Sequence, residues 1–297
     1  MNKLRLIRLG FEVKVLTTTC LPGYLGNTIR GALGSSLVRL HCLKTDKASC
    51  EKCNRIETCI YSNVFKSLYK DAEFTSVPNP YIIEVSERKK REYTAGESIY
   101  FAIVLFGEAT KYIEEFVNGV KHMMARDFGG VSNKFELSKV FEEYTNSLIF
   151  EGNTFLHLPE PVVWTDRGAD AIPKVTELKI QFVTPIQILQ KSHLIKEIEF
   201  DVFIDSLMSR IASIVDLYEE EEFVIPYRLI CRKPWIKADM KLKEKAIRQE
   251  RGVAKGMVGH VRYSGEITRY MPYIDLGQQL HVGKLTTRGF GQYRFSF

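Results

Sequence analysis

The last part of the chain carries its strongest pattern, with GMVGHVRYSG at residues 256–265 and LHVGKLTTRGFGQYRF at residues 280–295. Glycines recur there around short β-branched and aromatic runs, a pattern typical of sharp turns or close backbone approaches. Cations alternate with aromatic rings in the same segment. Cations and bare amides suit phosphates, and flat rings suit bases. The segment therefore predicts nucleic-acid contact, for which the candidates are Lys284, Arg288, Gly289 and Gly291.

Positive charge is concentrated directly before this segment. The chain has a formal net charge of +6, and lysines and arginines outnumber acidic residues between residues 237 and 262. A basic tract beside a glycine-rich segment favours a polyanionic partner. The predicted RNA-binding residues of the tract are Lys245, Arg248, Arg251, Lys255, His260 and Arg262. The alternative is a solvated lysine-rich helix or loop.

Length and composition indicate a folded protein of two domains. The chain has 297 residues, of which 45% are hydrophobic, and this is enough for two ordinary cores. No stretch has the apolar length needed to span a bilayer, and the N-terminus lacks a signal-peptide core. We therefore expect a cytoplasmic protein without a membrane partner.

The order of predicted elements indicates the fold. Residues 4–15 alternate like a strand, 25–43 have helical spacing, 81–85 and 98–106 are strand-like, 111–126 are helical and 135–141 are strand-like. The order strand, helix, strand, strand, helix, strand is the ferredoxin-like split unit. Three glycines lower the intrinsic helicity of 25–43, so we expect a close packing partner there.

The same order recurs after residue 175. Strands are predicted at 178–188, 229–236, 258–267 and 288–295, with a helix at 200–217 and a short helical or irregular piece at 270–281. We therefore predict an α+β protein of two tandem ferredoxin-like (βαββαβ, RRM-like) domains. The first covers residues 1–160 and contains a cysteine-rich metal-binding insertion at about 42–65, and the second covers 175–297.

The insertion contains four cysteines in the pattern C-x7-C-x2-C-x5-C, namely Cys42, Cys50, Cys53 and Cys59. Four thiolates in a short polar stretch can close a tetrahedral shell around a structural Zn²⁺. An iron–sulfur cluster accepts the same ligands, and the third alternative is four free thiols. Zinc is the preferred assignment, because no redox motif accompanies the cysteines.

These residues carry a family resemblance. Both glycine-rich segments resemble the C-terminal signature of CRISPR-associated RAMP-superfamily endoribonucleases, which cut precursor CRISPR RNA within its repeats. The segment LPGYLGNTIRGALG at 21–34 resembles the start of their first helix, and the cysteines followed by YSNVF at 61–65 are similar to a four-cysteine subgroup. The resemblance implies repeat RNA as the partner and a reaction without a metal cofactor. In that reaction the 2′-hydroxyl attacks the adjacent phosphate and leaves a 2′,3′-cyclic phosphate and a 5′-hydroxyl.

Such chemistry needs a base, an acid and a cation. The resemblance implies a histidine near the first helix, for which His41 is the candidate, with Tyr24 and Lys47 as helpers. A straight helix would separate Tyr24 from His41 by roughly 25 Å, so this pair requires a broken helix. His281 in the glycine-rich segment is the second candidate, and its alternative role is to anchor the loop.

Two other functions remain open from the sequence. One is a non-catalytic RAMP subunit that holds guide RNA in an effector complex. The other is a zinc-stabilised interaction module without a nucleic-acid role. The sequence also leaves open whether the chain forms a homodimer.

Overall fold

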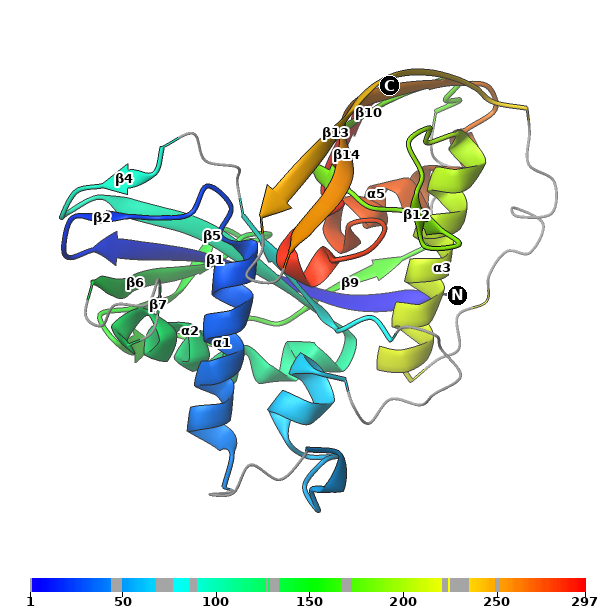
Figure 1. Ribbon diagram of the computed structural model, residues 1–297. Helices are drawn as coiled ribbons and strands as arrows, with labels where there is room; N and C mark the ends of the chain where they lie inside the picture. The colour runs from blue at the N-terminus through cyan, green and yellow to red at the C-terminus, as the bar shows by residue number, and fades with distance from the viewer. Residues whose placement is uncertain are drawn as a thin grey trace. The chain divides into compact units, whose positions relative to one another are not determined.

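The computed structural model describes residues 2–43, 50–67, 77–85, 90–126, 128, 134–166, 173–220, 224, 235–248 and 252–297. These residues divide into two compact units (Figure 1). One unit spans Arg5–Val163, and the other combines Trp164–Phe297 with the residues up to Leu4. We call them the N-terminal and C-terminal units. None of the helices within the described residues is long and apolar enough to cross a membrane.

The N-terminal unit has the predicted order of elements. The sheet consists of β3 (Tyr81–Glu84), β5 (Ser98–Phe106), β1 (Lys3–Val15) and β6 (Phe135–Glu142), all antiparallel and in the order β3-β5-β1-β6. The helices α1 (Gly26–His41) and α2 (Ile113–Arg126) pack against each other. This connectivity is that of the split unit predicted from the sequence.

Short elements complete the unit. They are β2 (Thr19–Cys20) paired with β4 (Glu92–Tyr93), the 3₁₀ turns η1 (Cys50–Lys52) and η3 (Gly107–Tyr112), and the π-helix η2 (Tyr61–Phe65). The strands β7 (Ser147–Glu151) and β8 (Thr154–Phe155) extend the sheet beyond β6, and β9 (Val162–Thr165) pairs with β1.

One glycine of α1, Gly34, and one of α2, Gly119, allow close packing, and the close neighbour expected for α1 is Phe65. A Cβ at Gly34 would lie 2.6 Å from the ring of Phe65, and one at Gly119 of α2 would lie 2.9 Å from Leu33. Real Cβ atoms do not approach other atoms so closely. Gly34 therefore lets η2 lie directly against α1, and Gly119 lets α2 do the same.

The C-terminal unit has the same connectivity as the N-terminal unit, with strands and helices of different lengths. Its sheet has the order β13-β14-β10-β15, built from β10 (Glu177–Ile186), β13 (Lys237–Arg248), β14 (Val253–Ser264) and β15 (Tyr293–Ser296), all antiparallel. The helices are α3 (Phe200–Tyr218) and α5 (Met271–Leu280). The pair β11 (Leu189–Gln190) and β12 (His193–Leu194) and the 3₁₀ turns η6 (Thr268–Tyr270) and η7 (Thr286–Arg288) complete it.

One face of this sheet is packed with aromatic rings. The ring of Phe203 on α3 contacts Tyr263 of β14 and Tyr293 of β15 at centroid distances of 6.1 and 5.3 Å. Both tyrosines are buried, and their hydroxyls donate to the carbonyls of Ile198 and Ile274 at 2.6 Å. We call this side the inner face, and the opposite side the outer face.

The structure excludes the alternative that was considered for the basic tract. Residues 237–248 and 253–264 form the long antiparallel hairpin β13–β14 (Figure 1), not a solvated helix or loop. The predicted strand at 229–236 falls largely outside the described residues, and the second strand of the sheet is β13. The lysines of β13, at positions 237, 241, 243 and 245, are separated by even numbers of residues and share one face of the strand.

Candidate nucleic-acid interface

The outer face of the C-terminal sheet gathers cations from all four strands. Residues paired directly across an antiparallel ladder share a face, and the register pairs Lys241 with His260, Arg262 with both Asp239 and Lys179, and Arg294 with Gln181. The cations of the outer face are Lys179, Lys237, Lys241, Lys243, Lys245, Arg262 and Arg294. Most are exposed, and the acidic residues at the described ladder positions of this face are Glu177 and Asp239.

This face has the chemistry of a phosphate-binding surface. Rows of cations on a rigid sheet can contact successive phosphates of a nucleic-acid strand. Three of the predicted RNA contacts, Lys245, His260 and Arg262, lie here. Lys179 was not predicted, because it joins the tract only through strand pairing, and Arg294 of the glycine-rich segment joins the tract in the same way.

Two other predicted contacts lie elsewhere. Lys255 is on the inner-face side of the hairpin, where its Nζ lies 3.0 Å from Glu244, and Glu244 also lies 3.6 Å from Lys196. The pKa of Glu244 is lowered by its hydrogen bond to Lys255. Arg248 alternates onto the same side as Lys255, and Arg251 lies outside the described residues.

The glycine-rich loop uses its amides within the protein. The amides of Gly289 and Gly291 donate to the carbonyls of Thr286 and Pro185 at 2.8 and 2.9 Å. Both glycines are buried and have φ of +85° and +76°. A Cβ at Gly291 would collide with the carbonyl oxygen of Val282. The two amides are therefore used within the loop, and Gly291 is needed for its fold. Contact of Gly289 and Gly291 with RNA stays a prediction.

The two cations of this loop are more exposed than its two buried glycines. The side chain of Lys284 is exposed, while its backbone amide donates to the carbonyl of Gln187 at 2.8 Å. Arg288, at the end of η7, is half-buried. Lys284 thus remains a candidate for contact with phosphate.

His281 is an internal residue. Its side chain is fully buried, and its Nδ1 lies 2.9 Å from the carbonyl oxygen of Phe290. A carbonyl only accepts, so Nδ1 carries the hydrogen and donates. Of the two roles considered for His281, the structure supports the loop anchor and not the catalytic base.

His41 is the last residue of α1 and is partly exposed. Its Nε2 is buried and forms no hydrogen bond with any described residue. A buried ring nitrogen without a partner is an unsatisfied polar atom, which a bound ligand would satisfy once the ring turns this nitrogen toward it. Lys47 lies outside the described residues.

Tyr24 does not lie near His41. The helix α1 is continuous from Gly26 to His41, so its 16 residues span about 24 Å. Tyr24 precedes the helix and is only 9% exposed. The broken helix that a Tyr24–His41 pair requires is therefore absent from this described segment.

The four cysteines of the insertion are described and are not in disulfides. Cys42 follows α1 directly, and Cys50 and Cys53 are joined by a turn in which the Cys53 amide donates to the Cys50 carbonyl at 3.0 Å. Burial raises the pKa of the Cys50 thiol, and so do the neighbouring thiols of Cys59, Cys42 and Cys53. Within the described ranges no three His, Cys, Asp or Glu side chains are close enough to hold a metal ion.

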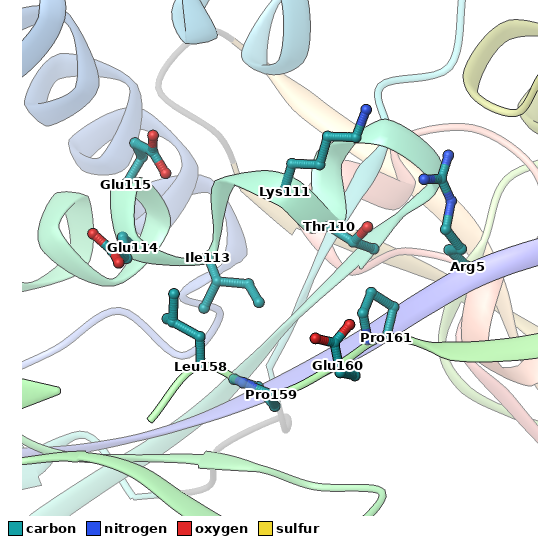
Figure 2. Close-up of a pocket in the computed structure, with 10 residues that line it drawn as sticks. All are labelled: Arg5, Thr110, Lys111, Ile113, Glu114, Glu115, Leu158, Pro159, Glu160 and Pro161. Carbon is teal, nitrogen blue, oxygen red and sulfur yellow. The ribbon is translucent and has the colours of Figure 1, made fainter. Parts of the chain in front are cut away.

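A hollow of about 420 Å³ in the N-terminal unit has mixed charge. Figure 2 shows Arg5 and Lys111 on one side of it, Glu114 and Glu115 on another, and Glu160 beside two prolines. Because both signs line this hollow, its charge does not favour a polyanion.

Comparisons with known proteins cover both units. The profile of the family described as CRISPR-associated endoribonuclease Cas6 matches residues 180–293. The profile of an N-terminal domain family, AF_1859_N, matches residues 4–161, which is more than half of the chain. A protein of Archaeoglobus fulgidus, described only as uncharacterized, is 22% identical over 280 residues, which are 92% of either chain.

Solved structures share the fold. Thermus thermophilus Cas6 in a product complex superposes with a TM-score of 0.61 at 11% identity, over 98% of this chain and 99% of that chain. A RAMP protein that binds different RNA substrates gives a TM-score of 0.51 at 11% identity, over 98% and 100%. At such low identity the likeness is one of fold.

Proposed function

We propose that this chain, whose residues 180–293 match the CRISPR-associated endoribonuclease family Cas6, cleaves precursor CRISPR RNA within the repeats, without a metal cofactor. The single observation that carries this proposal is the basic outer face of the C-terminal sheet on a chain that matches this family. The Cas6 from Thermus that shares the fold was solved as a product complex, which supports RNA as the substrate here.

The proposed reaction is an internal transfer at one phosphate. The 2′-oxygen attacks phosphorus, its proton passes to Nε2 of His41, and the bond from phosphorus to the 5′-oxygen breaks. The leaving 5′-oxygen takes up a proton and becomes a hydroxyl, while the other fragment keeps a 2′,3′-cyclic phosphate. The unpartnered Nε2 of His41 supports its role as the base. Lys47 is the candidate cation for the charge on phosphorus.

The outer face of the C-terminal sheet holds the RNA in this proposal. Its cations project from a sheet that is fixed by the aromatic core on the inner face. Binding by such a surface depends strongly on salt, because each phosphate contact releases counterions.

A structural Zn²⁺ is proposed for Cys42, Cys50, Cys53 and Cys59. The spacing of the four cysteines and the turn that joins Cys50 to Cys53 support a common site. The cysteine side chains, which are not close enough to one another to hold a metal ion within the described ranges, would have to close around it. The ion would cross-link the insertion to the end of α1 and would leave no open position for catalysis. Metal analysis should find one zinc per chain, and the Cys53→Ser variant should lose it. A metal-free wild-type protein of equal stability would contradict this site.

The cleavage experiment uses labelled repeat RNA with the protein in excess EDTA. We expect a product that ends in a 2′,3′-cyclic phosphate. Because this end has no free 3′-hydroxyl, it cannot be ligated to another RNA until the cyclic phosphate is opened and removed. RNA that is bound but not cut would instead identify a non-catalytic RAMP subunit. RNA that is not bound at all would favour the interaction module.

A further inference from the structure

A second cationic surface lies on α1, in the N-terminal unit. Residues of α1 and of the segment 61–66 enclose a groove of about 460 Å³, here called the α1 groove. All of its lining residues belong to the N-terminal unit. The proposed function makes no use of it.

The charge of the α1 groove is uniformly positive. Its charged lining residues are Arg30, Arg39 and Lys66, and none of the described residues that line it is acidic. The guanidinium of Arg30 lies over the ring of Phe65, 5.1 Å from its centroid, and Arg30 Nε is buried without a hydrogen bond to any described residue. Stacking on a ring fixes the guanidinium but leaves its N–H groups available. The groove therefore suits an anionic ligand.

Three aromatic rings form a column at the wall of the groove. Tyr61 stacks on Phe65 at 5.6 Å and 16°, and Phe65 stacks on Tyr81 at 5.2 Å and 13°. Phe65 and Tyr81 are buried, whereas Tyr61 is partly exposed. The column is thus anchored in the core and ends in a partly exposed ring, over which Lys66 Nζ lies 6.0 Å from the centroid. An unpaired base would stack on this ring in place of the ammonium group. A peptide stretch of aspartate and glutamate alone has no ring to stack on Tyr61.

The groove follows the helix face that carries His41. At 100° per residue, His41 falls between Arg30 and Gly34 around the axis of α1 and lies one turn beyond Val38. From Arg30 to Arg39 the groove extends about 14 Å along the helix. A strand that lies in it would therefore lead to the histidine.

We propose that the α1 groove binds a short single-stranded segment of the RNA next to the nucleotide whose 2′-hydroxyl His41 deprotonates. Phosphates contact Arg30, Arg39 and Lys66, and a base stacks on Tyr61. This inference rests on the proposed function. It adds an RNA-binding site on the N-terminal unit, in which three cations contact phosphates and one tyrosine ring stacks on a base.

Gly31 offers a direct way to block the groove. It lies on the exposed side of α1, and a Cβ added there would meet nothing within 4 Å. A larger residue should also stabilise the helix, since glycine is the weakest ordinary helix former. Gly31→Glu places an acid in the groove, and Gly31→Ala is the matched control that leaves it open. We expect Gly31→Glu to weaken binding of repeat RNA at least tenfold and Gly31→Ala to leave it unchanged.

The salt dependence of binding reports on the phosphate contacts. In the His41→Ala background, which prevents cleavage, the double change Arg39→Gln/Lys66→Gln should lower the slope of log K against log[salt] by about 1.4, at roughly 0.7 for each phosphate contact to a single strand. Lys111→Gln, an exposed lysine of the same unit at the hollow of mixed charge, should leave the slope unchanged. Photo-crosslinking of RNA that contains 4-thiouridine should label Tyr61.

The outcomes separate the two proposals. If the wild-type protein does not bind repeat RNA, the proposed function fails. If it binds and cuts RNA, but Gly31→Glu and Arg39→Gln/Lys66→Gln bind like the wild type, only the α1 groove assignment is overturned. In a third outcome, labelled poly-glutamate binds to the wild-type protein while these variants keep full RNA affinity. That result would identify the groove as a peptide site and would also overturn the inference.

Discussion

The imidazole of His281 and the carbonyl of Phe290 are joined across the glycine-rich loop, with Nδ1 2.9 Å from the oxygen. The ring is fully buried, and His281 itself adopts φ +57°. The bond ties the end of α5 to the turn that precedes β15. It makes the histidine of this segment a part of the scaffold.

His281→Ala should therefore lower stability while sparing the chemistry. Loss of the ring leaves the Phe290 carbonyl without this buried donor, which costs about 1–3 kcal/mol. Urea unfolding measures that loss. Below the unfolding transition and with saturating RNA, single-turnover cleavage should proceed at the wild-type rate. A stable variant that no longer cuts would return His281 to the catalytic site.

His41→Ala should have the opposite effect. Removal of a general base lowers rates by about 10²–10⁴, whereas the cations that hold RNA stay in place. Single-turnover cleavage and filter binding measure the two effects separately. His157→Ala, at an exposed histidine of the same unit, should change neither. Normal cutting by His41→Ala would refute the assignment.

The two faces of the hairpin β13–β14 should differ in their effect on RNA. Lys241→Gln/Lys243→Gln removes two outer-face cations and should reduce the salt slope of binding by about 1.4 for a single strand. The control Lys196→Gln/Lys255→Gln also removes two positive charges, but from the two lysines that form ion pairs with Glu244. It should leave the salt slope unchanged. Equal slopes for the two double variants would show that the outer face is not the binding surface.

Gly34→Ala and Gly31→Ala test the packing of α1. The methyl group at position 34 would meet the Phe65 ring at 2.6 Å, so overpacking should cost about 1–3 kcal/mol. At position 31 the added Cβ meets nothing within 4 Å, and the higher helix propensity of alanine should add up to about 1 kcal/mol. Thermal unfolding should therefore move in opposite directions. A shift in the same direction would mean that Phe65 does not pack on α1 in this way.

Stability should fall in alkaline solution because buried tyrosines must ionise. Burial raises the pKa of Tyr273 to about 12, and it raises the pKa of Tyr263 and Tyr293 well above their usual value near 10. The unfolded state thus binds fewer protons than the folded state above pH 10. Stability is complete below pH 10 and declines as pH rises toward 12, by up to about 1.4 kcal/mol per pH unit for each tyrosine.

Urea midpoints measured between pH 8 and pH 11 test this decline. Tyrosinate absorbance shows whether the three rings stay protonated until the protein unfolds. Titration of all tyrosines near pH 10 in the folded protein would contradict the prediction.

The sequence by itself determined the local elements. Period-two alternation predicted β1, helical spacing predicted α1, α2 and α3, and the glycines of α1 predicted a close neighbour, which proved to be Phe65. These features depend on residues near one another in the chain, so the pattern of one segment is enough. The same holds for His41, whose place at the end of α1 follows from helical spacing.

Only the tertiary structure decided what each polar group faces. Strand pairing added Lys179 and Arg294 to the cations of β13 and placed Lys255 on the opposite side. Long-range contacts turned Gly291 and His281 inward, although their sequence resembles an open phosphate-binding loop. The packing of η2 against α1 created the α1 groove. A sequence pattern specifies on which face of its own helix or strand a residue lies. The residues that pack against that face come from segments distant in the chain, so only the tertiary structure identifies them.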